Sequence, residues 1–464
     1  MSAEGLQAAE EKMRSQDVPD VFVDTFRNYY EQLEEGDSGL LPDAELETVD
    51  EIQSADDLPS DPEAESEALG RAVVIKLNGG LGTSMGMSAP KSLLPVKEGL
   101  SFVDIVARQT VALRREHDAR LPLALMNSFS TREESIAALE RHEELSDQDV
   151  PLDFVQHKGP KLLADDLTPA SWPDDPDLEW APPGHGDLYT ALVTSGMLER
   201  LLAADYEYAF VANIDNLGAV LDPRILAWFA SQELPFLMEV ADRTEADRKG
   251  GHLAARQDGG LVLREIAQAP EDDVDSFQDT SRWRFFNTNT MWVNLRSLDE
   301  VLRERDGVLG LPIIVNHKTV DPTDSSSPKV VQVETAMGAA IAVFEGAQAL
   351  RVPRERFAPV KTTNDLLGLR SDAYVLREEC HVVANPERTH TSLYVDLDPD
   401  HFKLIDDFDA RFPEGPPSLV DCERFVVKGD VRFGEGVVAH GCVEVEASEG
   451  EDQLVVEDGT ELSG

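Results

Sequence analysis

The chain has 464 residues, 41% of them hydrophobic, which is enough to organise two or three packed units. Its 90 acidic residues against 41 basic ones give a formal charge of −49, a field that would repel nucleic acids and anionic membranes. We therefore expect no nucleic-acid partner and no membrane partner, and we interpret the acid surplus as a solvated surface of the kind suited to a salty cytoplasm.

Targeting signals and cysteine patterns are both missing from the sequence. The residues after Met1 include neither a basic region nor an apolar core, so we expect no signal peptide, and no apolar run approaches the ~20 residues that span a bilayer. The three cysteines, at 380, 422 and 442, are odd in number and far apart, which predicts neither a disulfide framework nor a zinc site. These features favour a cytoplasmic protein.

Residues 1–70 are polar and acidic. A weak helical pattern runs from about Val21 to Glu35, and a stretch rich in Pro, Asp, Glu and Ser follows from Leu41 to Glu67. We interpret this part of the chain as a helical leader followed by a solvated connector.

Residues 71–370 alternate apolar runs of strand length with segments of helical period, the pattern of an α/β domain with a mixed, mostly parallel sheet. Two helix starts are also predicted: Ser130–Glu133 has the spacing of a capping box, and Asp222-Pro223 suits an N-cap followed by the first helical residue. The predicted strands are Ala72–Leu77, Leu121–Met126, Phe154–Gln156, Tyr208–Ile214, Phe236–Val240 and Met291–Leu295.

In residues 371–464 the helical signal fades. Short apolar triplets, such as Phe425–Val427 and Leu454–Val456, recur between Gly, Asp and Glu. This periodicity predicts a small all-β unit, and it fits a β-helix with short rungs.

The most informative segment is Leu77–Gly86, which reads Leu-Asn-Gly-Gly-Leu-Gly-Thr-Ser-Met-Gly and directly follows an apolar strand. Its glycines let the backbone approach a phosphate chain. The glycine spacing is one residue too long for a dinucleotide fingerprint, and Lys91 follows Pro90 where a Walker A loop needs glycine. A glycine cluster alone is often only a turn, but the Pro90–Ser92 sequence at this distance favours a nucleotide site.

This segment, together with Pro90-Lys91-Ser92, resembles the signature of the eukaryotic-type UDP-glucose pyrophosphorylases. The resemblance spans about 71–374, and it implies a Rossmann-like nucleotidyltransferase domain followed by a C-terminal left-handed β-helix. It also implies transfer of a uridylyl group from UTP to glucose 1-phosphate, with Mg²⁺ as the cofactor. Further blocks agree in the same order: Asn127–Phe129, Pro182–Asp187, Asn213–Gly218, Lys249–Gly251, Phe286–Asn289, Ile314–Asn316, Glu334–Ala336 and Pro359–Thr363.

The resemblance also implies roles for single residues. Gln156 would read uracil, because an amide donates and accepts at once, and Asp215 would be the hard oxygen ligand of Mg²⁺. Lys91 and Lys361 would face the reacting phosphates as catalytic residues. The implied UTP-binding residues are Leu77, Asn78, Gly79, Gly80, Lys91, Gln156, Gly184 and Asn213, and the implied sugar-phosphate-binding residues are His185, Asn213, Ile214, Asp215, Asn287, Asn289 and Glu334.

Each of these residues also has a purely structural interpretation. Gln156 is by default a solvated strand end, and Lys361 a surface cation beside a helix that Thr362 caps. The asparagines would be local caps. The sequence also departs from the family pattern at Met87–Ala89 and at His157–Lys161, and the second departure weakens any specific role for Lys158.

Three rival functions remain open on the sequence. A pyrophosphorylase of the same fold could take N-acetylglucosamine 1-phosphate or many sugar phosphates, although Asn78 and Met85 favour glucose. A sugar-nucleotide sensor could keep the pocket without catalysis, although the intact Lys91, Asp215 and Lys361 argue against it. A nicotinamide-dependent oxidoreductase fits the glycine spacing poorly. The oligomeric state stays open, a homo-oligomer included.

Overall fold

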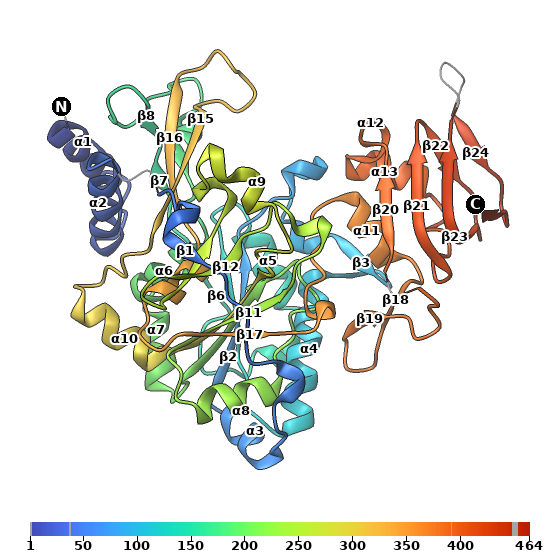
Figure 1. The fold of residues 1–464 in the computed structure, drawn as a ribbon, viewed down its shortest axis with the longest axis horizontal. Helices are drawn as coiled ribbons and strands as arrows, with labels where there is room; N and C mark the ends of the chain where they lie inside the picture. The colour runs from blue at the N-terminus through green and yellow to red at the C-terminus, as the bar shows by residue number, and fades with distance from the viewer. Residues whose placement is uncertain (1, 37–38, 391, 448–452) are drawn as a thin grey trace.

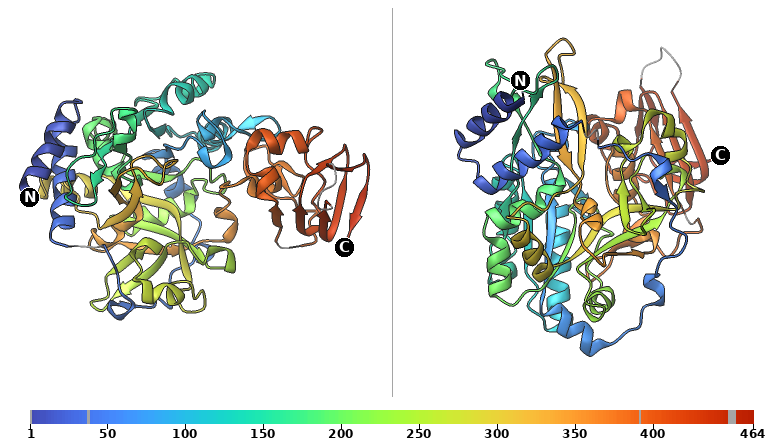
Figure 2. Two further views of the ribbon diagram at one scale, coloured as in Figure 1. Left: turned by 90° about the horizontal axis from the view of Figure 1, so that it is seen from above. Right: turned by 60° about the vertical axis from the view of Figure 1, so that its left-hand side comes forward.

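The computed structural model describes residues 2–36, 39–390, 392–447 and 453–464, and it shows a central α/β body with a helical pair at one end and a β-rich unit at the other (Figure 1). These two parts lie at opposite ends of the long axis (Figure 2). No helix in the described ranges is both long and apolar enough to cross a bilayer. The helices are α1 (Ser2–Arg14), α2 (Asp20–Glu34), α3 (Pro62–Leu69), α4 (Phe102–His117), α5 (Arg132–Leu139), α6 (Leu188–Thr194), α7 (Met197–Ala203), α8 (Pro223–Ser231), α9 (Val274–Phe277), α10 (Leu295–Glu304), α11 (Thr363–Arg370), α12 (Pro399–Phe402) and α13 (Ile405–Arg411).

A ten-stranded mixed sheet forms the centre of the body. Its main order is β1-β12-β14-β10-β2-β5-β6, and β11, β17 and β13 pair beside this path. The predicted strands of the α/β domain all lie in this sheet. Their bounds are β1 (Leu46–Glu47), β2 (Ala72–Asn78), β5 (Leu123–Asn127), β6 (Asp153–Val155), β10 (Tyr208–Asn213), β11 (Phe236–Asp242), β12 (His252–Arg256), β13 (Leu261–Arg264), β14 (Phe285–Asn294) and β17 (Gln348–Arg351).

The sheet is covered on both faces, which explains why most residues of its central strands are apolar. All seven residues of β2 are buried. Val74 packs in one core with α3, α4 and α8, whereas its neighbours Val73 and Ile75 pack in a second core with α6, α7 and α10. Because successive side chains of a strand point to opposite faces, this division follows directly from the pleat.

The expectation of a mostly parallel sheet is correct for one half only. Strands β10, β2, β5 and β6 pair in parallel, but β14 is antiparallel to β10, β11 and β12. The ten-residue β14 runs antiparallel to each of these three neighbours. The sheet is therefore mixed: strands β10, β2, β5 and β6 form a parallel part, the pairs around β14 are antiparallel, and β17 pairs in parallel with β11.

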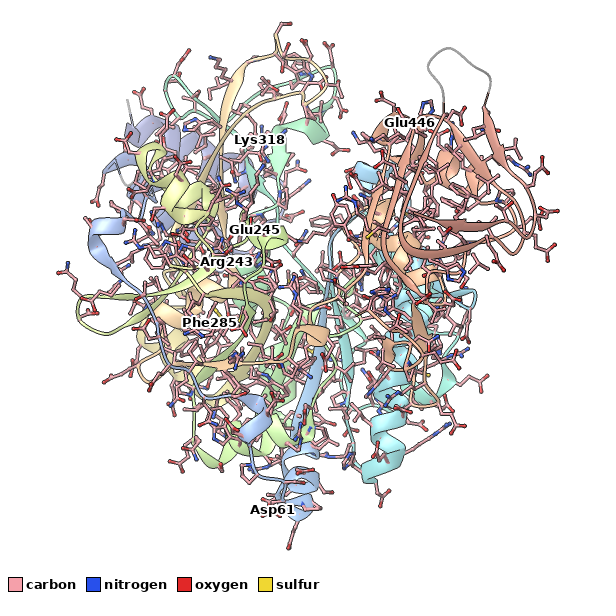
Figure 3. All side chains as sticks on the ribbon, turned by 45° about the vertical axis from the view of Figure 1, so that its right-hand side comes forward. Asp61, Arg243, Glu245, Phe285, Lys318 and Glu446 are labelled. Carbon is pink, nitrogen blue, oxygen red and sulfur yellow. The ribbon has the colours of Figure 1, made fainter. Side chains whose placement is uncertain are left out.

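Three smaller sheets lie in the body outside the large sheet. Strands β15 (Ile313–Thr319) and β16 (Lys329–Thr335) are antiparallel, and β8 (Leu162–Leu163) joins them. This arm, which carries Lys318, projects on the same side of the body as the C-terminal unit, which carries Glu446 (Figure 3). The short pairs are β3 (Pro95–Lys97) with β4 (Leu100–Ser101) and β7 (Gly159–Pro160) with β9 (Trp180–Ala181).

The C-terminal unit consists mainly of parallel strands, but it is not all-β as predicted. Helices α12 and α13 pack on it, with Phe402 and Phe408 buried beside Phe412 and Phe433. Strands β20, β21, β23 and β25 stack in one sheet and β22 and β24 in another, all in parallel. The strands of this part are β18 (Tyr374–Leu376), β19 (Val382–Ala384), β20 (Tyr394–Leu397), β21 (Cys422–Lys428), β22 (Val431–Phe433), β23 (Val438–Glu446), β24 (Leu454–Val456) and β25 (Glu461–Ser463).

The N-terminal part is more closely integrated than its composition predicts. Helix α2 forms over the expected residues and buries Phe22, Phe26 and Tyr30. The segment 41–67, predicted to be a solvated connector, contributes β1 to the large sheet through pairing with β12, and it buries Leu46.

One of the two predicted helix starts is confirmed. Asp222 caps α8 by accepting a hydrogen bond from Arg224 N, and Pro223 is the first helical residue. The predicted capping box at Ser130–Glu133 is wrong: α5 begins after Thr131, whose hydroxyl forms no cap and instead donates to Asn78 O at 2.6 Å. Thr131 thus serves the loop after β2 rather than its own helix.

Candidate active site

The glycine-rich loop follows β2 at the carboxyl edge of the parallel strands, where ligands of open α/β sheets bind. Gly82 and Gly86 have φ of 64° and 75°, which only glycine adopts without strain. No atom lies within 4 Å of where a side chain on Gly80 would begin. The loop backbone is therefore free to approach a phosphate chain.

Asn78, predicted to bind UTP, has its side-chain amide occupied within the protein. Its Nδ2 donates to Asn127 Oδ1 at 2.7 Å and to Ser135 Oγ at 2.8 Å, and the residue is only 2% exposed. Leu77 is also buried, and its carbonyl accepts from Ile214 N at 3.1 Å. These two residues shape the loop, and the groups left for a nucleotide are those of Gly79 and Gly80.

Gln156 lies directly beside this loop. Its backbone N–H donates to Asn127 O at 2.8 Å, one strand away from Asn78. A Cβ placed on Gly79 would lie 3.0 Å from Gln156 Nε2, so the glycine allows the amide to rest against the loop. The structure thus brings together two of the predicted UTP-binding positions that lie about 80 residues apart in the sequence.

Lys91 and Asp215 form an ion pair. Lys91 Nζ lies 2.6 Å from Asp215 Oδ2, and the two side chains are 16% and 21% exposed. The backbone of Lys91 is tied to the glycine loop by its N–H, which donates to Gly80 O at 3.1 Å. Asp215 follows β10, where Asn213 pairs with Leu77, so a cation and a carboxylate meet where β2 and β10 end.

Lys361 reaches the same edge from a segment far along the chain. Val360 N donates to Asp215 O at 3.2 Å, which places the next residue beside the carboxylate turn. Lys361 is exposed, and its Nζ lies 5.7 Å from the centroid of the Phe357 ring. The predicted cap at Thr362 is confirmed as a capping box with Asp365 at the start of α11.

The loop Gly184–Asp187 is held against β16. Gly184 has φ of 80°, and a Cβ there would overlap Thr335 O, so the position requires glycine. Met337 N donates to His185 Nδ1 at 2.9 Å, which leaves the proton of a neutral ring on Nε2. Burial lowers the pKa of His185 to about 4. His185 is therefore neutral at neutral pH and presents an N–H donor.

The remaining predicted sugar-binding residues form two groups. Asn287 and Asn289 bond to each other across a β-bulge in β14, with Asn287 Nδ2 2.9 Å from Asn289 Oδ1, and Asn289 has φ of 55°. Glu334 lies on β16 beside Gly184, and burial raises its pKa although Lys318 lowers it in part.

Glu265 was missed by the sequence reasoning. A Cβ on Gly251 would lie 2.5 Å from its Oε2, and Gly251 O accepts from Asn287 N at 2.9 Å. Burial raises the pKa of Glu265, and the charge of Lys361 lowers it in part, so the carboxyl lies within electrostatic reach of that lysine. The Lys249–Gly251 block indicated this place in the fold, but nothing in the sequence indicated Glu265 itself.

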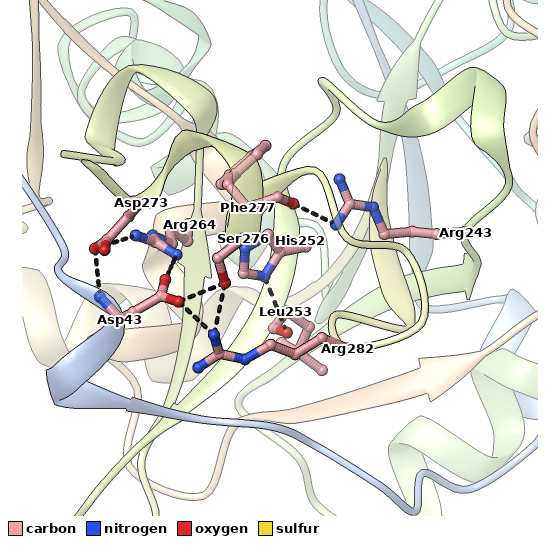
Figure 4. A network of polar contacts seen from close by, with 9 residues as sticks. All are labelled: Asp43, Arg243, His252, Leu253, Arg264, Asp273, Ser276, Phe277 and Arg282. Carbon is pink, nitrogen blue, oxygen red and sulfur yellow. Dashed lines mark hydrogen bonds and ion pairs between the residues drawn. The ribbon is translucent and has the colours of Figure 1, made fainter. Parts of the chain in front are cut away.

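A buried polar network supports this side of the site (Figure 4). Asp43, from the N-terminal segment, pairs with Arg264 and Arg282, and Arg264 also reaches Asp273 at 3.2 Å. The Arg243 guanidinium donates to backbone carbonyls, including Arg248 O at 2.8 Å, next to the turn that leads into Gly251. The network thus fixes the strands and turns that carry Gly251 and Asn287.

The donor set of the site limits how a metal ion could bind. Within the described ranges, no group of three or more His, Cys, Asp or Glu side chains could hold a metal ion on its own. Asp215 is the carboxylate at the edge where the glycine loop and Lys91 meet. Mg²⁺ is commonly bound by one protein carboxylate, with substrate phosphates and water as the other ligands. The same arrangement suits Zn²⁺ poorly.

The chain is similar to known proteins along most of its length. A family model described as UTP–glucose-1-phosphate uridylyltransferase matches residues 20–440. The enzyme of that name from Solanum tuberosum is 41% identical over 408 residues, which cover 88% of this chain and 83% of the relative. One from Dictyostelium discoideum is 38% identical over 418 residues, 89% of this chain and 80% of the relative.

Solved structures show the same similarity along almost the whole chain. A variant of UDP-glucose pyrophosphorylase from Leishmania major, in complex with UDP-glucose, matches with a TM-score of 0.92 and 43% identity over 99% of this chain and 98% of that one. A structure from Trypanosoma brucei matches with a TM-score of 0.89 and 42% identity over the same shares. The chain therefore belongs to the UTP–glucose-1-phosphate uridylyltransferase family.

Proposed function

We infer that the protein transfers the uridylyl group of UTP to glucose 1-phosphate, which yields UDP-glucose and pyrophosphate. The observation that carries this conclusion is the meeting of the glycine loop, the Lys91–Asp215 pair and Lys361 at one sheet edge. The fold that contains this edge matches the structure of a UDP-glucose complex over 99% of the present chain.

We propose that UTP binds along the carboxyl ends of β2, β5 and β6. The Gln156 amide and the Gly184 backbone would read the uracil edge, because both can donate and accept without a charge. The backbone N–H groups of Gly79 and Gly80 would hold the phosphates. Asn78 and Leu77 would contribute through the shape that they give the loop, since their own polar groups are used inside the protein.

We propose that Mg²⁺ binds at Asp215 together with the substrate phosphates. The fit is supported by the partly exposed Asp215 carboxylate at the strand end, which is a hard oxygen donor. A bound Mg²⁺ would neutralise phosphate charge. Lys91 now occupies one oxygen of Asp215, so the ammonium and the metal would share this carboxylate or the ammonium would turn toward the phosphates.

The reaction needs no covalent enzyme intermediate. An ionised phosphate oxygen of glucose 1-phosphate attacks the α-phosphorus of UTP in line, a P–O bond forms, and the bond to the β,γ-pyrophosphate breaks. The chain's part is to position the substrates and stabilise charge through Lys91, Lys361 and the loop amides. The neutral His185 would donate its Nε2–H to the sugar phosphate without adding a titrating charge.

We propose that Asn287, Asn289 and Glu334 bind the glucose hydroxyls, and we add Glu265 to this set. The proximity of the Glu265 carboxyl to Gly251 and its charge interaction with Lys361 support its inclusion. We also propose a cytoplasmic location and a left-handed coil for the C-terminal strands. Their stacked parallel pairings support the β-helix.

The test is a panel of sugar 1-phosphates with UTP and Mg²⁺, followed by pyrophosphate release and product mass. We expect glucose 1-phosphate to give UDP-glucose, and CTP and ATP to react poorly, because each unpaired polar group costs on the order of 1–3 kcal/mol. Release with N-acetylglucosamine 1-phosphate at a similar rate would favour the broader enzyme. Tight UTP binding without any release would overturn the enzymatic function in favour of a sensor.

A further inference from the structure

The segment that carries Lys361 is fastened to the turn that carries Asp215. We call residues 355–361 the strap and residues 213–219 the Asp215 turn. Asn216, only 2% exposed, joins them: its Nδ2 donates to Arg356 O at 3.1 Å, and its Oδ1 accepts from Ala358 N at 2.9 Å. One side chain therefore satisfies a donor and an acceptor of the strap backbone.

Backbone contacts on both sides of Asn216 complete this connection. Asn216 forms an antiparallel bridge with Pro359, and Val360 N donates to Asp215 O at 3.2 Å. On the other side, a Cβ on Gly218 would overlap Glu355 O, so only glycine permits so close an approach. The strap and the turn therefore pack backbone to backbone, with Asn216 between them.

The strap is also anchored below the site by a buried ion pair. Arg356 Nε lies 2.8 Å from Glu239 Oε2, and Arg356 Nη2 lies 2.7 Å from Glu239 Oε1. The carboxylate of Glu239 also accepts from Trp292 Nε1 at 2.9 Å, and its side chain is fully buried. Such a two-pronged, desolvated pair resists rotation of the arginine and fixes the start of the strap.

The far end of the strap is fixed as well. Lys361 N donates to Asp365 Oδ2 at 2.8 Å, where the capping box of α11 begins. The backbone of Lys361 is thus held from both directions, whereas its side chain is exposed. The strap consequently sets the backbone position of Lys361, and the ring that the ammonium contacts, Phe357, belongs to the strap as well.

We propose that Asn216 is a positioning residue of the reaction: by clamping the strap to the Asp215 turn, it fixes Lys361 relative to the phosphates held at Asp215. This inference rests on the proposed function of Lys361. Asn216 itself would not contact substrate, because both ends of its amide are occupied by the strap. Its position in the Asn213–Gly218 block would then reflect geometry and not ligand binding.

The first test is Asn216→Ala, which removes both side-chain hydrogen bonds of the clamp. We expect kcat to fall by about 10- to 100-fold, because a shift of about 1 Å in a reacting group can cost on the order of 100-fold. The KM for UTP should stay within about threefold, since Gln156 and Gly184 lie on other elements. A folded variant with the parent's kcat would overturn the proposal.

The second test is a double-mutant cycle with Lys361. Lys361→Gln alone should lower kcat by about 10²- to 10³-fold. If Asn216 acts through Lys361, adding Asn216→Ala to this variant should cost less than about a further twofold. Fully multiplicative losses would show that Asn216 acts elsewhere, for instance through Asp215, and would overturn the proposal.

Amide hydrogen exchange of the strap gives a readout that does not depend on activity. In Asn216→Ala, the amides of Ala358 and Val360 should exchange at least tenfold faster than in the parent. The matched control is Asn294→Ala, which removes hydrogen bonds to Arg296 N and Ser297 N at the start of α10. The control should keep both the parent's kcat and the parent's exchange in the strap.

If Asn216→Ala does not fold, Asn216→Ser provides the same test. The neutral hydroxyl is too short to make both hydrogen bonds of the clamp and adds no buried charge, so a loss of kcat in the same direction is expected. A parent-like kcat in Lys361→Gln would refute the role of Lys361 and the inference with it. A loss in Lys361→Gln without any loss in the folded Asn216 variants would overturn only the inference.

Discussion

At the scale of single residues, the site separates side chains that serve the backbone from side chains that face a ligand. The amides of Asn78 and Asn216 are both buried and both used within the protein, although each belongs to a block that resembles the family. Lys361 and Gln156 are more open, and their polar ends are not all used in this way. Sequence blocks alone do not make this distinction, because supporting and contacting residues occur side by side in them.

Replacing Asp215 is expected to weaken the binding of Mg²⁺. Asp215→Asn keeps the shape of the side chain but loses the anionic oxygen that Mg²⁺ prefers. We expect the fold to be retained, and the Mg²⁺ concentration for half-maximal activity to rise on the order of 10-fold. The measurement is initial rate against free Mg²⁺ at saturating UTP and glucose 1-phosphate.

A matched control for this substitution lies far from the site. Asp61 caps α3 and lies at the opposite end of the molecule from Lys318 and Glu446 (Figure 3). Since Asn is as good an N-cap as Asp, Asp61→Asn should change neither stability nor the Mg²⁺ curve. Superimposable Mg²⁺ curves for Asp215→Asn and the parent would show that the metal binds elsewhere.

At the scale of elements, helix α2 supports the Gly184 loop from behind. The Phe22 ring stacks on His157 with centroids 4.4 Å apart. His157 Nδ1 lies 2.8 Å from Asp187 Oδ1, at the end of that loop. Tyr29 on the same helix is hydrogen-bonded to Thr335, and burial raises its pKa. The N-terminal leader is therefore part of the structure behind the nucleotide site.

This contact predicts an effect of α2 on UTP binding. Phe22→Leu should raise the KM for UTP by about 2- to 10-fold with little change in kcat, because an aromatic stacking contact contributes about 0.5–1.5 kcal/mol. The matched control is Phe26→Leu, a buried position on the same helix that does not stack on His157. The measurement is the steady-state kinetics of both variants, once their Tm values have been shown to be equal. Equal KM values for the two variants would contradict a specific role for Phe22.

The elements differ in how far the sequence determines them. Strands such as β2 and β10 are recognisable because burial on both faces makes most of their residues apolar. The direction of β14 and the presence of α12 and α13 depend on contacts with distant segments, which local patterns do not record. The environment of Lys76, in the middle of β2, is likewise not recorded in local sequence patterns. Burial lowers the pKa of Lys76 to about 7, and its ammonium donates to Ala219 O at 2.6 Å.

The candidate site shows the same limit. Lys91, Asp215 and Lys361 were predicted from blocks that resemble the family, and each block follows a strand or precedes a helix. Glu265 belongs to no such block, because its proposed role arises only where β13 ends beside Gly251. Predicting it from sequence would have required the register of β12 against β13 and β14.

At the scale of the whole molecule, the acid surplus and the cationic site act against each other. The formal charge of −49 is spread over a chain whose proposed substrates are themselves anions. Lys91 is partly neutralised by Asp215 until phosphate arrives, so the site adds little positive charge to the resting protein. The surplus therefore remains as a repulsive term among surface carboxylates.

This repulsion predicts that salt stabilises the protein. Screening shortens from about 10 Å at 0.1 M to about 3 Å at 1 M salt, so most long-range repulsion between carboxylates disappears over that range, while contacts such as the buried Arg356–Glu239 pair are hardly screened. We expect Tm to rise on the order of 5 °C between 0.1 and 1 M KCl at pH 7.5. Sorbitol at the same osmolality controls for exclusion of the solute from the surface, and it should raise Tm less. If KCl lowered Tm, attractive surface ion pairs such as Lys428–Glu444 would outweigh the repulsion, and the acid surplus would not be a cost to the folded state.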